Sequence, residues 1–153
     1  MPDHPTIAID PPLEPAEVAF IAAFAVEHGG AGVRRVWPGQ PRRHCPWRPS
    51  RDGRALELDP VRSQADPDSV AGWLRFLSRE FLAPSTAASL ETALTQGLRG
   101  GHRLTGAVVV DGRRIAVDLG RVTDESLPPP EVDAVVLDMN TRRAHHDRQV
   151  TER

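Results

Sequence analysis

The sequence LTGAVVVDGRRIAVDL, which runs from Leu104 to Leu119, decides the fold because it is typical of a β-hairpin. Two largely apolar runs flank Asp111-Gly112, and this dipeptide tolerates the positive φ angles of a type I′ turn. In the second arm, Ile115, Val117 and Leu119 fall on one face and polar or small side chains on the other. One buried and one solvated face predict an antiparallel sheet covered by helices on one side.

More strands are expected nearer the start of the chain. Residues 6–10 alternate in polarity like a short strand. The tight-turn residues 51–54 (Arg-Asp-Gly-Arg) predict a second hairpin, whose first arm includes Trp47 and whose second includes Leu56 and Leu58.

Three helices are expected to cover the sheet. Residues 15–28 have apolar side chains at helical spacing and are followed by a glycine pair. The run 66–69 (Asp-Pro-Asp-Ser) is a good helix start, and the apolar stripe after it ends at Pro84. Leu90, Ala93 and Leu94 predict a third helix.

The predicted fold class is therefore α+β, with a small, mostly antiparallel sheet of four to six strands and two or three helices on one face. A length of 153 residues fits a single domain, which we place at residues 1–127. Three prolines open a C-terminal extension over residues 128–153, with a candidate edge strand at 134–139 and a frayed tail. The core is expected to contain Phe20, Ile21, Phe24, Leu56, Leu58, Trp73, Leu77, Phe81, Val108, Val110, Ile115 and Val117.

Composition disfavours several classes of protein. No apolar run approaches the roughly 18 residues of a membrane span, and no secretory leader pattern opens the chain. Cys45 is the single cysteine, so an internal disulfide and a CxxC metal site are ruled out. We therefore expect a cytoplasmic protein without membrane contact.

Charge is concentrated in one segment. The net charge is −2, yet residues 34–54 contain seven arginines and only one acid, Asp52. All basic residues are arginine and lysine is absent, which indicates a high-GC genome and makes each arginine weaker evidence of anion binding. The segment is nevertheless strongly basic within an acidic-to-neutral chain.

Residues 34–54 also contain aromatic side chains among the arginines, and three interpretations are open. The tryptophans could anchor a surface loop to the core, the segment could contact a protein partner, or it could bind nucleic acid by phosphate pairing and base stacking. For the partner-binding interpretation, the candidate residues are Trp37, Arg42, Arg43, His44, Trp47 and Arg48.

Evidence for catalysis is weak. Cys45 precedes Pro46, which favours an extended backbone that turns His44 away from the thiol, so a small buried thiol is expected. His44, Asp59, His102 and Asp118 could supply metal ligands for a hydrolase, but no recognised ligand spacing connects them. We predict no catalytic residue, metal or cofactor.

Four blocks carry a resemblance to a family. They are PPLEPAE (residues 11–17), WPGQP (37–41), CPW (45–47) followed by Asp52-Gly53, and GWLRFLSREFL (72–82). Together they resemble short actinobacterial proteins of unknown function, some of them associated with mobile elements. The resemblance covers roughly residues 6–120 and implies a shared fold and a high-GC origin, without assigning any functional residue.

The sequence thus favours a non-enzymatic protein-interaction module, an adaptor or a small oligomer, that uses residues 34–54. Nucleic-acid binding through the same segment is the first alternative, and a metal-dependent hydrolase is the second. The sequence leaves the identity of the partner and the oligomeric state open.

Overall fold

The hairpin predicted over residues 104–119 forms as expected. A computed structural model describes residues 5–27, 37–42, 44–59 and 66–129. Strands β4 (Arg103–Val110) and β5 (Arg113–Asp118) pair antiparallel with Val108 opposite Ile115. Asp111 and Gly112 have φ angles of 48° and 72°, as a type I′ turn requires.

A second turn of the same kind adds a strand that the sequence did not predict. Leu119 and Gly120 have φ angles of 49° and 78° and lead into β6 (Arg121–Ser126). The expectation that Leu119 shares the buried face of Ile115 and Val117 is wrong, because its backbone turns out of the strand and it is 72% exposed.

Three further strands complete one antiparallel sheet in the described part of the chain. Strand β1 (Thr6–Asp10) lies between β4 and β3 (Ala55–Leu58), and β2 (Trp47–Pro49) pairs with β3. The strand order is β2-β3-β1-β4-β5-β6. The second predicted hairpin is thus confirmed, with β2 and β3 as its arms.

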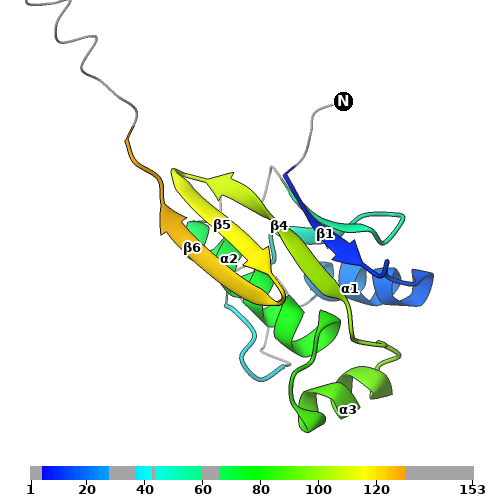
Figure 1. Cartoon of the computed structure of the whole chain (residues 1–153). Helices are drawn as coiled ribbons and strands as arrows, with labels where there is room; N and C mark the ends of the chain where they lie inside the picture. Colours follow the sequence, from blue (N-terminus) through cyan, green and yellow to red (C-terminus); the bar gives the residue numbers. More distant parts are fainter. Residues whose placement is uncertain (1–4, 28–36, 43, 60–65, 130–153) are drawn as a thin grey trace, which may run out of the picture.

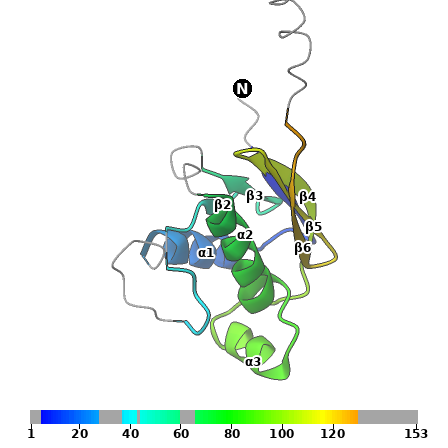
Figure 2. The same ribbon diagram turned by 90° about the vertical axis from the view of Figure 1, so that its left-hand side faces the viewer.

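The helices lie on one side of this sheet (Figures 1 and 2). Helix α1 spans Pro15–Glu27, and α2 spans Pro67–Leu77. Asp66 caps α2, accepting the Ser69 N–H at 2.7 Å. The chain then widens into a π-helix, η1 (Ser78–Leu82), before α3 (Ala87–Thr95). The α+β class is therefore confirmed, with six strands and three α-helices in the described part of the chain.

The core fills the space between helices and sheet. Each residue predicted for the core is buried except Phe20, which is partly exposed but packs against it. Fully buried side chains that the sequence did not single out for the core include Ile7, Trp47, Leu82 and Leu104. Strand β6 ends at Ser126, whereas the predicted edge strand at 134–139 and the tail lie outside the described residues.

Two glycines in turns provide a matched test of backbone packing. Gly53 and Gly112 both have φ of 72°, but a Cβ at Gly53 would lie 2.4 Å from the Leu13 carbonyl oxygen, whereas one at Gly112 would meet nothing within 4 Å. We expect Gly112→Ala to cost only backbone strain, about 1 kcal/mol. Gly53→Ala should cost roughly 1–3 kcal/mol more, because the clash breaks the Leu13 N–H bond to the Gly53 carbonyl. Urea unfolding of both variants measures the difference, and equal losses would contradict this account.

Candidate functional site

Trp47, predicted to contact a partner, belongs to the core. Its side chain has no exposed surface, and its indole N–H donates a 3.0 Å hydrogen bond to the Val70 carbonyl of α2. The prediction that Trp47 lies on an accessible face is therefore wrong. It lies on β2 on the inner face of the sheet, opposite Leu58, and so faces the helices.

Trp37 also works as an anchor, although its ring stays partly exposed. The ring packs edge-on against Phe24 and Phe81, with centroids 6.3 and 5.0 Å apart. Its indole N–H donates to Glu80 Oε2 at 3.2 Å. The sequence left loop anchoring, a protein contact and nucleic-acid binding open for the tryptophans. The positions of both indoles agree with loop anchoring.

The turn after Trp37 is contacted by a side chain of η1. Arg79 Nε donates to Glu80 Oε1 at 2.9 Å. A Cβ placed on Gly39 would lie 2.8 Å from Arg79 Nη2, so the guanidinium sits directly against this turn. Gly39 has φ of +80°, and the Gln40 N–H closes the turn on the Trp37 carbonyl at 3.1 Å. Glu80 therefore joins an indole and a guanidinium in one anchoring group.

The polar candidates that the structure describes near the two tryptophans are exposed. We define residues 37–42 and 44–48 as the cationic loop. Arg42 and His44 are exposed, and Arg48 keeps 55% of its side chain exposed while its Nη2 lies 3.3 Å from Asp59 Oδ2. Arg43 lies outside the described residues. The loop thus combines a buried, apolar support with an outward cationic edge.

Cys45 is fully buried, with its Sγ 3.4 Å from the Trp47 carbonyl oxygen. The expectation of a small buried thiol is confirmed. A thiol with no exposed surface cannot reach a substrate in this conformation.

A buried histidine–carboxylate pair is the feature that the sequence did not reveal. His102 Nε2 lies 3.1 Å from Glu17 Oε1, and both side chains are buried. His102 Nδ1 lies 2.7 Å from the Pro11 carbonyl oxygen, so both ring nitrogens face acceptors. Which ring nitrogen donates depends on the tautomer of His102.

The backbone completes the pair. Glu17 Oε2 accepts the Glu14 N–H and Glu17 Oε1 the Arg99 N–H, each at 2.8 Å. Burial by itself would raise the pKa of Glu17, but these two backbone donors and His102 together outweigh it and leave the pKa below its usual value. With all its polar atoms used internally, the pair fastens the segment before β4 to the start of α1.

The residues considered as metal ligands are not brought together. His102 is occupied by Glu17, and Asp59 pairs with Arg48. Among the residues that the model describes, no group of three or more histidine, cysteine, aspartate or glutamate side chains is placed to hold a metal ion. The same residues include no helix of the length and apolarity that crossing a membrane requires.

Comparison with known proteins adds no family. No family model matches the chain, and no curated protein or solved structure is significantly similar to it. The resemblance to actinobacterial proteins remains a prediction.

Glu17 and Glu14 form a matched pair for testing the buried cluster. In Glu17→Gln only one side-chain oxygen remains to accept the hydrogen bonds that two carboxylate oxygens accept in the wild type. We therefore expect the free energy of unfolding to fall by roughly 3–5 kcal/mol near neutral pH. Glu14 forms an exposed ion pair with Arg99 at 2.9 Å, and Glu14→Gln should cost less than about 1 kcal/mol.

The stability lost in Glu17→Gln should also depend on pH in a defined direction. Because the pKa of Glu17 is lowered by folding, its stabilisation is present above the pKa of the unfolded chain and is lost as the pH falls through the folded value. The difference in the free energy of unfolding between wild type and Glu17→Gln should therefore become smaller as the pH falls. Urea unfolding from neutral to acidic pH measures this difference in stability, and a difference that does not change with pH would contradict an ionised Glu17.

Proposed function

We propose that this chain is a non-enzymatic protein-interaction module whose contact surface is the cationic loop. The observation that supports it most directly is the separation of roles within the cationic loop: Trp37 and Trp47 anchor it to the core, while Arg42 and His44 lie exposed between them. A loop held in place before binding loses less conformational entropy when a partner arrives. The expected partner is a protein with an acidic surface, because guanidinium groups pair bidentately with carboxylates.

The aromatic rings argue for a protein partner over nucleic acid. Binding to single-stranded nucleic acid relies on exposed rings that stack on bases. Trp47 is enclosed, and the ring of Trp37 packs against Phe24 and Phe81. The arginines alone could contact phosphates, so nucleic acid is retained as an outcome of the test.

Substitution of exposed arginines tests whether the cationic loop binds the partner. A partner captured by wild-type protein is purified and its affinity is measured by calorimetry for Arg42→Glu, for Arg48→Gln and for Arg103→Glu. Arg103 is an exposed arginine that projects from β4 on the sheet face opposite the helices. We expect Arg42→Glu to weaken binding by about tenfold or more, Arg48→Gln less, and Arg103→Glu hardly at all.

Two results would count against this function. Equal binding by all variants would place the contact elsewhere on the molecule. Alternatively, fluorescence anisotropy with single- and double-stranded oligonucleotides could show affinity that falls steeply with salt and is lost in Arg42→Glu. That result would replace a protein partner with nucleic acid.

A further inference from the structure

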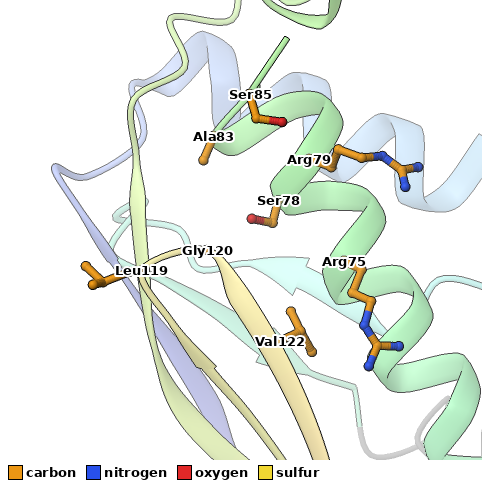
Figure 3. A pocket seen from close by; sticks show the side chains of 8 residues that line it. All are labelled: Arg75, Ser78, Arg79, Ala83, Ser85, Leu119, Gly120 and Val122. Carbon is orange, nitrogen blue, oxygen red and sulfur yellow. The ribbon is translucent and has the colours of Figure 1, made fainter.

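A pocket of about 410 Å³ lies between α2–η1 and the turn that joins β5 to β6 (Figure 3). Its volume falls within the range of small-molecule sites, about 300–1,000 Å³. It is hollow because small residues meet there: Ser78 and Ala83 on the helix side and Gly120 on the sheet side. Even a Cβ on Gly120 would stay 3.9 Å from Ser78 Oγ.

Within the described residues, the pocket lining includes one arginine that forms no ion pair. Arg75 and Arg79 both belong to its lining, one helical turn apart. Arg79 is neutralised by Glu80, and its guanidinium points away from the hollow (Figure 3). The Arg75 side chain runs along the side of the pocket where Val122 lies, and its guanidinium is directed away from Ser78 (Figure 3). No acidic residue lines the pocket, and no ion pair is seen for Arg75 within the described residues. A monoanion therefore matches the pocket better than a dianion.

Hydroxyl groups accompany this cation. Ser78 is buried, yet its hydroxyl points toward the hollow and makes no hydrogen bond in the described chain (Figure 3). Ser78 and Arg75 are three residues apart, which places them on one helix face. Ser85 adds a second hydroxyl from the chain beyond η1. A guanidinium group and a hydroxyl group can each donate hydrogen bonds to a carboxylate.

Two irregularities of the backbone converge on the same place. The π-turn closes with the Ala83 N–H on the Ser78 carbonyl at 2.7 Å, and π-helices are frequent at functional sites. On the opposite wall, Leu119 has φ of 49°, a conformation uncommon for leucine. Residues held in such conformations cluster at ligand sites.

We propose that this pocket binds the carboxylate of a small organic acid or of a peptide C-terminus, with Arg75 as the anchoring cation and Ser78 as a hydrogen-bond donor. Val122 and Ala83 supply an apolar contact for the carbon atoms next to the carboxylate. This site does not depend on the cationic loop, so either proposal can fail without the other.

Titration of the ¹⁵N-labelled full chain by NMR tests the pocket. The probes are valerate, the acetylated tripeptide Ac-Ala-Ala-Leu with a free C-terminus, its C-terminal amide, and inorganic phosphate. We expect saturable shifts within residues 75–85 and 119–122, with affinity in the millimolar range. Arg75→Gln should weaken binding by about tenfold or more, and Arg79→Gln by no more than about twofold.

The arms of this experiment separate the sources of the carboxylate. Binding of valerate and the peptide acid supports a free organic acid, and binding of the peptide acid alone supports a C-terminus. The spectrum of each variant shows directly whether it is folded. The proposal is overturned if no probe saturates, if the amide binds as well as the acid, if phosphate binds more tightly, or if both arginine variants lose binding equally.

Discussion

The packing of Phe81 connects the parts of this protein that matter for its proposed role. Its ring lies 4.9 Å from Phe24 of α1, 5.0 Å from Trp37 of the cationic loop and 5.5 Å from Phe76 of α2, measured between centroids. Edge-to-face contacts of this kind stabilise beyond the area that they bury. Because Phe81 belongs to η1, the π-helix both carries this cluster and lines the pocket on its outer side.

Arginine has different roles at different positions in this chain. Arg79 is neutralised by Glu80 and supports the turn at Gly39, and Arg113 bridges Asp124 and Asp68. Arg42 and Arg75, by contrast, carry their charge to the surface. In a chain without lysine, the number of arginines says little about binding. What separates the two groups is whether an acid among the described residues already neutralises the guanidinium.

Local patterns predicted the elements well, and long-range contacts explain what they missed. Asp111-Gly112 identified one hairpin, and Asp66 the start of α2. Strand β6 was missed because its turn begins with Leu119, which is a poor signal for positive φ. The apolar and cationic character of residues 34–54 was visible, but the sequence did not show that Trp47 turns inward.

The buried pair was the hardest feature to foresee, because Glu17 and His102 are 85 positions apart. A signal existed all the same. Glu17 stands four residues before Ile21 on the apolar stripe of α1, and a carboxylate on such a stripe requires a partner. The sequence could indicate that need, but only the tertiary fold identifies the histidine.

The outer strands of the sheet have a consequence for how the protein behaves in concentrated solution. An exposed strand edge can template the addition of further chains and so start aggregation. At one edge, β2 is three residues long and ends at Pro49, which has no N–H to offer. At the other, β6 carries Arg121, Asp124 and Glu125, and three prolines follow it in the sequence at 128–130. Both outer strands are thus poor templates for fibril growth.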